Sequence, residues 1–412
     1  MVSLARNGWT DEQILSALQG RSGSREVQFR YDVIRNGAKL REITATGSVS
    51  LNRFADIQRT GRFMIYDELD WLKDEIKPYM LLRMEDGVES AMAIALTCDE
   101  RDALQYTCAE WDALEMTCSQ LDMGEFGTSG FTKRYAEFPL GVFVLSTPTR
   151  KSKGALNTWE IEAYDRTVIL QEDSLTEPLY FAAGTAYLSA VQSVLVSAGV
   201  SDVFVMDYVG TALPAARQFD IGLKKLAVAN AMLSEINFNP VHCDADGRFI
   251  LSAYKESSVS DINLTYQADS LSLIARDTSS ETDFYNVPNV FIAVCSNPDL
   301  NTDYVSVWVN DSPVSRLSTV QRGRRIVSEI YRPDAIASQA ELDNYIARIA
   351  FEANQVYEQL TFSTALMPVH GSSEVLEIKH PDIEGVFVES SWELPLSADG
   401  QMAHTARRLV LI

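Results

Sequence analysis

The sequence contains four histidines, and none of them stands in a recognisable catalytic pattern. They are His242, His370, His380 and His404, and they are scattered among expected turns and strand ends. A catalytic imidazole needs a positioned base and an orienting partner. The chain also lacks the motifs G-x-S-x-G, H-E-x-x-H, G-x-x-x-x-G-K-[ST] and G-x-G-x-x-G. We therefore assign no catalytic residue and no cofactor-binding residue from the sequence.

Three cysteines recur ten residues apart in an internal repeat that keeps Thr, Cys and Asp in phase. The copies read TCDERDALQY at 97–106, TCAEWDALEM at 107–116 and TCSQLDMGEF at 117–126. Zinc sites usually draw two ligands from one turn, as in C-x₂-C, and this longer interval does not provide such a pair. We expect Cys98, Cys108 and Cys118 to pack as small apolar residues, and we predict no metal site.

Each copy of the repeat also begins with a helix-start signal. A Thr is followed three residues later by Glu or Gln, which is the capping-box pattern. The pairs are Thr97 with Glu100, Thr107 with Glu110, and Thr117 with Gln120. We predict three very short helices, or one stepped helical stack, in an insertion over residues 97–126 that projects from a connection between strands.

The segment Asp244-Ala245-Asp246-Gly247 resembles the opening of a calcium-binding loop. An EF-hand would need a bidentate Glu at position 255, where this chain has Lys255. We therefore interpret the segment as a hairpin turn. Glycoside hydrolysis by paired carboxylates stays open in a chain with 57 acidic residues, but no spacing singles out a pair.

One local positive cluster stands out, Arg322-Gly323-Arg324-Arg325. It is either a solvated loop or strand end, or a contact for an acidic partner such as a neighbouring subunit.

The composition describes an ordinary folded chain of several domains. It has 412 residues, 46% of them apolar and 22% charged. The formal charge of −22 argues against a dedicated nucleic-acid-binding protein, because neutralising phosphates takes clustered Lys and Arg. No stretch approaches the ~18 consecutive apolar residues of a membrane span, and the N-terminus lacks the apolar region of a secretory signal. We expect no stable membrane insertion, and the five cysteines indicate reduced thiols.

The first part of the chain is dominated by strand patterns. A short amphipathic helix is predicted over 8–19, with Thr10 as its cap. Apolar and polar residues then alternate over 27–33, and Asn36-Gly37 is the strongest short hairpin signal because both residues tolerate positive φ. Further strands are predicted at 61–66, 78–84, 138–147 and 157–164.

Helical spacing appears after residue 171. One helix is predicted through Leu188 and Leu195 with Gly199 as its terminator, and a second over 219–236. A hairpin follows at 242–254.

The rest of the chain returns to strands. They are predicted from about 262, at 289–296, at 303–309 and from 374 to the end. A long helix over 338–361 interrupts them, and Ser338 with Glu341 forms its capping box.

In this order the chain resembles the tail hub, or baseplate hub, proteins of tailed bacteriophages and prophages. The segment EVQFRYDVIRNGAKLREITATGSVSLNRFADIQRTGRF is similar to the opening hairpin of that family, YAEFPLGVFVLSTP at 135–148 to its "FPLGVF" strand, and WEIEAYDR at 159–166 to the strand that follows. Residues 216–249 resemble the helix and "D-x-x-G" hairpin of its middle domain, 331–368 its late helix, and 396–409 its terminal segment. The resemblance extends over nearly the whole chain.

The resemblance implies an α+β, β-rich fold with two tube-type β-barrel domains, an α/β domain between them and helical insertions. The implied domains are a helical extension at 1–23, a first barrel at 24–170 carrying the insertion 97–126, an α/β domain at 171–261, and a second barrel at 262–412 with the helix 338–361. The insertion departs from the family pattern. It either contacts a neighbouring tail protein or is a passive elaboration of the surface.

The resemblance also implies a structural virion protein and not an enzyme. Such hubs are homotrimers that join the hexameric tail tube to the threefold tail tip and form part of the DNA-ejection conduit. The implied partners are the distal tail or tail tube protein, tail tip or fibre proteins and the tape measure protein, with DNA passing through the lumen without specific binding. The implied location is the tail tip of a virion assembled in the host bacterial cytoplasm, and no cofactor is implied.

Two other classes of function remain open at this point. A carbohydrate-binding tail or adhesin module would present exposed aromatic side chains in a groove, for which Trp111, Trp159, Trp308 and Trp392 are candidates, although each fits a core position equally well. A cell-wall hydrolase would need an acidic pair that the sequence does not single out.

Overall fold

The chain forms two compact units in a computed structural model. The structure describes residues 4–21, 25–84, 135–153, 156–269, 273–282, 285, 287–296, 303–354, 358–371 and 373–409. One unit contains Arg30–Tyr79 and Pro139–Ile412, and the other contains Ser3–Phe29 and Met80–Phe138. The predicted insertion at 97–126, with Cys98, Cys108, Cys118 and Trp111, lies outside the described residues.

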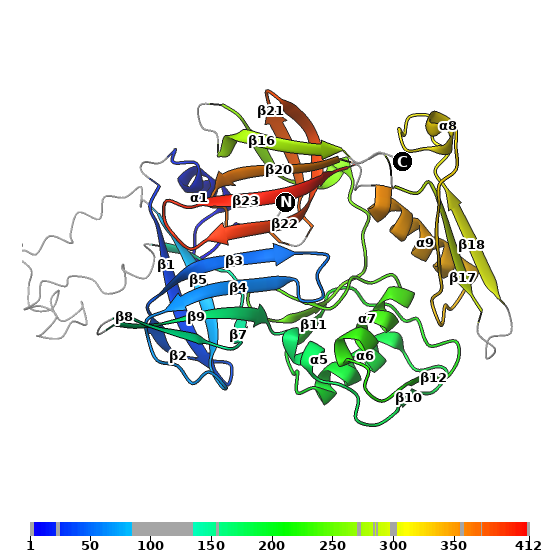
Figure 1. The fold of residues 1–412 in the computed structure, drawn as a ribbon, viewed down its shortest axis with the longest axis horizontal. Helices are drawn as coiled ribbons and strands as arrows, with labels where there is room; N and C mark the ends of the chain where they lie inside the picture. The colour runs from blue at the N-terminus through cyan, green and yellow to red at the C-terminus, as the bar shows by residue number, and fades with distance from the viewer. Residues whose placement is uncertain are drawn as a thin grey trace, which may run out of the picture. The chain divides into compact units, whose positions relative to one another are not determined.

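Most strands join one 15-stranded sheet, in which they form two groups along the sequence (Figure 1). The first group comprises β1 (Val27–Arg35), β2 (Ala38–Ile43), β3 (Ala45–Asn52), β4 (Arg59–Ile65), β5 (Glu75–Arg83), β6 (Tyr135–Pro139), β7 (Phe143–Leu145), β8 (Thr149–Lys153) and β9 (Leu156–Asp165). The second group comprises β15 (Ile262–Gln267), β16 (Ile274–Thr282), β20 (Glu358–Ala365), β21 (Val375–His380), β22 (Ile383–Pro395) and β23 (Gln401–Arg408). This β-rich architecture confirms the predicted α+β class.

The two strand groups are continuous because β22 pairs with β3. The antiparallel register runs from Ser391 opposite Asn52 to Pro395 opposite Ser48. Strand β3 also pairs with β4, and β22 also pairs with β21 and β23. The paired residues that link the two groups are therefore more than 300 positions apart along the chain.

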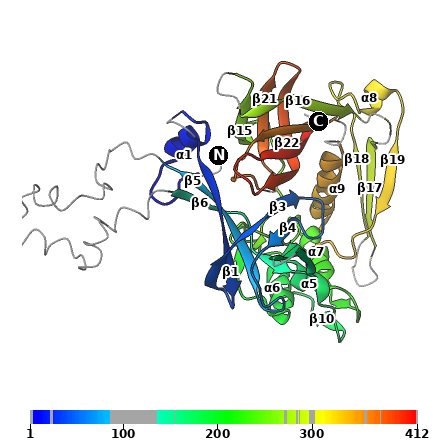
Figure 2. The ribbon, with the colours of Figure 1, turned by 60° about the vertical axis from the view of Figure 1, so that its left-hand side comes forward.

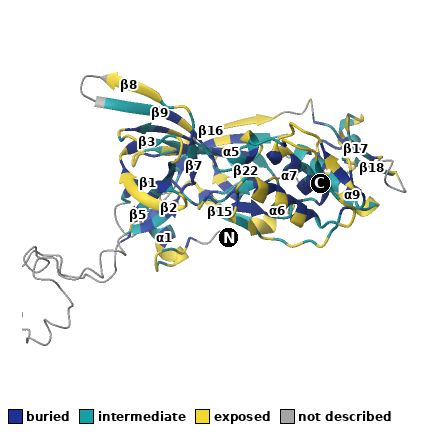
Figure 3. Ribbon diagram, turned by 90° about the horizontal axis from the view of Figure 1, so that it is seen from below, coloured by how far each residue is buried: buried dark blue, intermediate teal, exposed yellow. Residues whose placement is uncertain are grey.

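The predicted hairpin at Asn36-Gly37 is confirmed. Strand β1 pairs with β2, and Arg35 lies opposite Ala38 across a two-residue turn. Both turn residues have positive φ, 52° at Asn36 and 77° at Gly37, which is the combination that a type I′ turn requires. Strand β2 is exposed along almost its whole length (Figure 3).

An α/β layer lies between the strand groups in sequence. Its elements are α5 (Val168–Glu172), β10 (Leu179–Phe181), α6 (Tyr187–Ser197), β11 (Val203–Val205), β12 (Arg217–Phe219), α7 (Lys225–Glu235), β13 (His242–Cys243), β14 (Phe249–Leu251) and the 3₁₀ turn Val259–Asp261. Buried apolar residues of α6 and α7 share one core with β14. Helix α6 ends as predicted, since Gly199 has φ 84° and the amides of Gly199 and Val200 bond back to the carbonyls of Val196 and Leu195.

The helix predicted over 219–236 is shorter than expected. Phe219 is the last residue of β12, and α7 begins at Lys225. Gly222 has φ 87°, a left-handed conformation that cannot belong to a right-handed helix, so the segment between them turns. The helix ends before Asn237, whose φ of 55° matches the predicted stop.

A smaller sheet and a helix are inserted between β16 and β20. They are β17 (Val290–Cys295), β18 (Tyr304–Val309), α8 (Thr319–Arg322), β19 (Val327–Tyr331) and α9 (Gln339–Asn354). Helix α9 lies against one face of the sheet (Figure 2), where Leu342, Ile346 and Ala350 pack on Phe291 and Ala293. The helix predicted over 338–361 is thus wrong at its C-terminal end, because Glu358–Ala365 is strand β20. Leu360 and Phe362 are both buried at a spacing of two, which is the strand period.

The smaller unit contains the predicted N-terminal helix. Helix α1 spans Asp11–Leu18, and Thr10 forms a capping box with Gln13. In the same unit, the Arg6 guanidinium lies 4.9 Å from the centre of the Phe138 ring, and the Glu137 amide donates to Asn7.

No helix among the described residues is long and apolar enough to cross a membrane.

We predict that Gly47→Ala destabilises the first strand group. An added Cβ at Gly47 would lie 1.9 Å from the backbone oxygen of Arg62 on the paired strand, at a φ of 155°. The two strands would have to separate, so we expect a loss of about 2–4 kcal/mol in unfolding free energy. Denaturant unfolding measures this loss. Gly184→Ala is the matched control, because Gly184 also has positive φ but has open space around its Cβ position. An equal loss in both variants would contradict the prediction.

Candidate functional site

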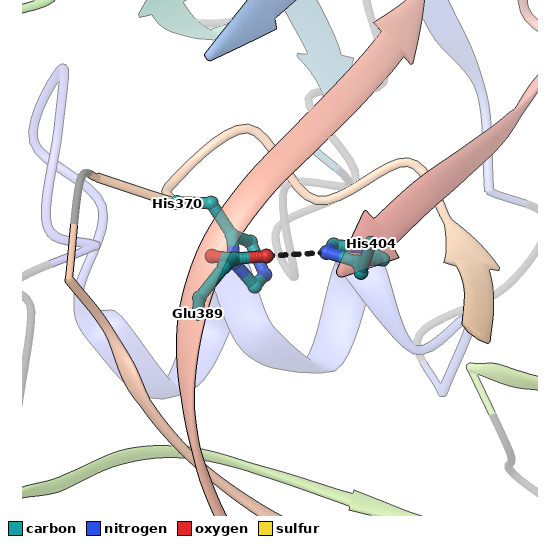
Figure 4. A group of neighbouring side chains, drawn as sticks. All are labelled: His370, Glu389 and His404. Carbon is teal, nitrogen blue, oxygen red and sulfur yellow. Dashed lines mark hydrogen bonds and ion pairs between the residues drawn. The ribbon is translucent and has the colours of Figure 1, made fainter. Parts of the chain in front are cut away.

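Two histidines and a glutamate that are far apart in sequence meet inside the second strand group (Figure 4). His370 lies in the loop after β20, Glu389 on β22 and His404 on β23. The Glu389 carboxylate bonds to both imidazoles, with Oε2 at 2.5 Å from His370 Nδ1 and Oε1 at 2.6 Å from His404 Nδ1. The three side chains are at most 1% exposed. We call these three residues the His–Glu–His cluster.

A bulge in β22 lies next to Glu389. The pairing of β22 with β23 shifts register between Glu389 and Ser391. The intervening Ser390 donates from its hydroxyl to the Thr405 carbonyl, and its own carbonyl accepts from the Arg53 amide. Bulges change the direction in which strand side chains point, so this one helps to set the carboxylate between the two rings.

The outer nitrogen of each imidazole is also occupied. The Tyr266 hydroxyl lies 2.7 Å from His370 Nε2, and the Thr364 hydroxyl lies 2.8 Å from His404 Nε2. The Phe362 ring stacks on His404 at 4.8 Å and 11°. Five hydrogen-bonding side chains from β15, β20, β22, β23 and one loop thus form a single buried network with aromatic walls.

The surroundings of the cluster lower the pKa of both Glu389 and His404. Burial opposes the charge of Glu389, but attraction and hydrogen bonds from His370 and His404 outweigh it and lower the pKa of Glu389. Burial lowers the pKa of His404. Nearby, burial raises the pKa of Glu374, whose carboxylate accepts a bond from the Gly371 amide. The ionised form of Glu389 is therefore favoured by its partners and not by water.

The donor set of the cluster is one that zinc or iron can use, two imidazoles and a carboxylate. In this structure those donor atoms contact one another directly at hydrogen-bond distance, and the carboxylate occupies the place between the rings. The side chains are also closed off from any dissolved substrate. The arrangement is suited to holding strands together, and it gives no position for a reacting molecule.

A second buried charged group lies in the α/β layer. Glu235 pairs with Arg217 and accepts a bond of 2.9 Å from the Tyr187 hydroxyl. Burial raises the pKa of Glu235 to about 7, against the attraction of Arg217. Arg217 also donates to Asp334 in the loop before α9, at 3.0 Å. This group ties the α/β layer to the inserted sheet and helix.

One described cavity, of about 520 Å³, lies between the 53–58 loop, the α/β layer and α9. Charged and aromatic side chains line it, among them Arg53, Tyr254, Arg348 and Glu352. Arg53 and Glu352 pair across it at 3.8 Å, and Arg348 bonds to the Phe238 carbonyl. Its arginines are committed to these contacts, and within the described residues it holds no nucleophile bonded to a base.

The predicted turn at Asp244–Gly247 is confirmed. Asp244 Oδ1 accepts from the amides of Asp246 and Arg248, and Gly247 has φ 83°. Asp246 pairs with Lys77 at 2.8 Å. The acids of this segment hold a hairpin turn and a neighbouring lysine.

Three of the four tryptophan candidates, Trp159, Trp308 and Trp392, lie among the described residues and occupy packed positions. Trp392 is 4% exposed and donates to the Gly371 carbonyl. Trp159 lies against Trp71, and Trp308 against Phe291.

Treating the histidines one at a time from the sequence missed the cluster. His242 bonds to the Pro240 carbonyl and His380 lies near Asp382, so these two stay apart from it. One available signal was Glu389, which is the only charged residue in the run Gly385–Trp392. A lone acid in an apolar strand needs a buried partner. The bulge that brings the partners together has no signature in the sequence.

Comparisons with known proteins place this fold among phage tail proteins. No family model matches the chain, and no curated protein sequence does. Among solved structures, a tail protein from Neisseria meningitidis MC58 aligns with a TM-score of 0.58 and 11% identity, covering 92% of this chain and 97% of that one. The 43 kDa tail protein of prophage MuSo2 from Shewanella oneidensis aligns with a TM-score of 0.55 and 9% identity, covering 92% of this chain and 98% of that one. Prophage tail protein gp18 from Listeria monocytogenes EGD-e aligns with a TM-score of 0.50 and 10% identity, covering 92% of this chain and 94% of that one. The resemblance to phage tail proteins is thus confirmed at the level of the fold.

We predict that Glu389→Leu destabilises the second strand group by about 3–5 kcal/mol, because it leaves two buried imidazole N–H groups without an acceptor. Glu393→Leu, on an exposed position of the same strand, is the control and should change stability little. Glu389→Gln keeps an acceptor and should lose less than Glu389→Leu. Denaturant unfolding of the three variants tests this order, and equal losses in Glu389→Leu and Glu393→Leu would refute a role for the cluster.

We also predict that His404 stays neutral below its ordinary pKa of 6.5, because burial disfavours the imidazolium. The unfolded chain takes up a proton there that the folded chain does not, so stability falls as the pH drops below 6.5. The lowered pKa of Glu389 adds loss in the same direction at lower pH. An NMR titration of the His404 ring tests this, and protonation at or above pH 6.5 would disprove it.

Proposed function

We propose that the chain is a structural tail-hub protein of a tailed phage or prophage particle. It forms a homotrimer that joins the hexameric tail tube to the threefold tail tip and lines part of the DNA-ejection conduit. The observation that carries this proposal is the shared fold with a solved tail protein over 92% of this chain and 97% of that one.

The two strand groups support the symmetry of this proposal. We assign each group to a tube-type barrel, the first within residues 24–170 and the second within 262–412, with the α/β domain at 171–261 between them. Three copies of a chain with two such barrels supply six similar units around an axis. A threefold oligomer can thereby meet a sixfold tube, and closed rings need a head-to-tail contact between copies.

The charge supports a conduit. A formal charge of −22 repels DNA, so DNA can pass along an acidic wall without adhering to it. The proposed neighbours are the tail tube or distal tail protein, tail tip or fibre proteins, and the tape measure protein. The proposed location is the tail tip of a virion that is assembled in the host bacterial cytoplasm.

A structural role also accounts for the chemistry that the chain presents. The His–Glu–His cluster, the group of possible metal ligands found among the described residues, is buried and satisfied by its own hydrogen bonds. We therefore propose that the protein is not an enzyme, with no catalytic residue, metal or cofactor assigned to it.

The proposed function predicts a trimer and a place in the particle. Light scattering behind size exclusion should give three times the chain mass of 45.9 kDa at high protein concentration. A labelled antibody against the chain should decorate one end of the tail in electron micrographs of intact particles. Label spread along the tail, or label on the head, would refute the hub.

A further inference from the structure

One face of the inserted sheet consists of branched aliphatic side chains. The sheet has the order β18-β17-β19, and α9 covers its opposite face. Three rows of paired residues cross the aliphatic face, Val309–Val290–Val327, Val307–Ile292–Ile330 and Val305–Val294. The outer members are exposed, with Val305 at 56%, Val307 at 51% and Ile330 at 47%. We call this surface the Val/Ile face.

Branched aliphatic side chains at a strand spacing of about 4.8 Å form a flat apolar surface. A contiguous exposed apolar surface marks a contact site in a folded protein, whereas apolar residues that are exposed singly are normal. Helix α9 is on the other side of the sheet (Figure 2). On the Val/Ile face Val290 is fully buried, whereas Val305, Val307, Val309, Val327 and Ile330 stay exposed.

The segment that leads into β19, together with β19 and the two residues after it, borders this face with positive charge. Residues 312–333 carry five arginines and one glutamate, a net charge of +4 in a chain of −22. Four of the arginines are exposed, Arg316, Arg324, Arg325 and Arg332. None of these four has an ion-pair partner among the described residues, although Arg324 lies over the Tyr285 ring. The partner of this surface is therefore expected to be both apolar and acidic.

The same chain presents such a surface at β11, an edge strand of its three-stranded sheet. Asp202, Phe204, Met206 and Tyr208 are exposed and alternate with less exposed residues. Phe204 is 52%, Met206 61% and Tyr208 83% exposed. Residues 171–224 carry six acidic and two basic side chains, a net charge of −4. We call the stripe formed by Asp202, Phe204, Met206 and Tyr208 the β11 edge.

We propose that the Val/Ile face of one copy binds the β11 edge of a second copy. Pairing two Val/Ile faces would bring the arginines of both copies together, and like charges at a contact oppose association. Pairing the face with the β11 edge joins apolar to apolar surface, and it brings the positive segment 312–333 towards the exposed Asp202 and the negative segment 171–224. Such a contact is head-to-tail, which is the kind that a threefold ring needs. The proposal rests on the proposed function in that it names the surfaces that hold the trimer.

Single substitutions test each side of the contact. Val307→Glu and Phe204→Glu should each reduce the light-scattering mass to that of one chain, because each places a charge in the apolar contact. Arg324→Glu with Arg325→Glu should weaken the trimer and abolish its sensitivity to salt. Val259→Glu is the matched control, since Val259 is an exposed valine outside both surfaces, and this variant should stay trimeric. Circular dichroism and thermal unfolding confirm that each variant is folded.

Mixing the two single variants gives the decisive result. The Val307→Glu chain keeps its β11 edge and the Phe204→Glu chain keeps its Val/Ile face, so one intact contact can form between them. The mixture should therefore contain a species of twice 45.9 kDa that neither variant forms alone. Absence of this dimer from the mixture would overturn the head-to-tail assignment.

The remaining outcomes separate this inference from the proposed function. A wild-type trimer that survives all these substitutions overturns the contact and leaves the hub in place. A trimer that survives while Val307→Glu chains fail to enter tails shows that another tail protein covers the face, which also overturns it. A wild-type chain that remains monomeric at the highest concentration reached overturns it as well, and the antibody labelling of particles then decides the hub separately.

Discussion

Strand β22 is the element on which the rest of the large unit depends. Its 13 residues pair with β21, β23 and β3, so one strand connects the two strand groups. Its two ends have different neighbours on one edge, β21 before the bulge beside Glu389 and β3 after it. The half before the bulge lies between β21 and β23, and Trp392 beyond it lies opposite Leu51 of β3. Without this strand, hydrogen bonding across the sheet would stop between the groups.

Buried polar groups on both sides of this junction make the pairing specific. In the first group, the Asp165 carboxylate accepts from the amides of Arg59 and Thr167, and the Arg59 side chain donates to the Leu140 carbonyl. The Arg59 guanidinium also lies 5.4 Å from the centre of the Trp392 ring on β22. In the second group the His–Glu–His cluster plays the corresponding part. A strand slipped by one residue would leave these buried groups without partners, at a cost larger than that of mismatched apolar contacts.

Local features of the sequence were predictable because their causes are local. The turn at Asn36-Gly37, the cap at Thr10 and the helix end at Gly199 each follow from the conformational preferences of one or two residues. The helix over 338–361 was overextended because Val356, Tyr357 and Leu360 continue the helical stripe in sequence while β20 recruits Leu360 into the sheet. The His–Glu–His cluster was missed because it depends on pairing between β22 and β23 and on a loop. His370 and His404 lie 19 and 15 positions from Glu389, and no spacing rule predicts that residues at these separations meet.

The distribution of charge shows why net charge alone could not describe this protein's contacts. A value of −22 indicates repulsion from DNA and says nothing about a particular neighbour. The arginines of residues 312–333 reverse that sign over one short segment, next to the Val/Ile face. Repulsion between whole chains falls off within about 8 Å at physiological salt, whereas apolar contact and opposite charges act where two surfaces touch. An acidic chain can therefore associate with its own copies when one basic, apolar face is kept for that contact, and the rest of its surface stays unattractive to DNA.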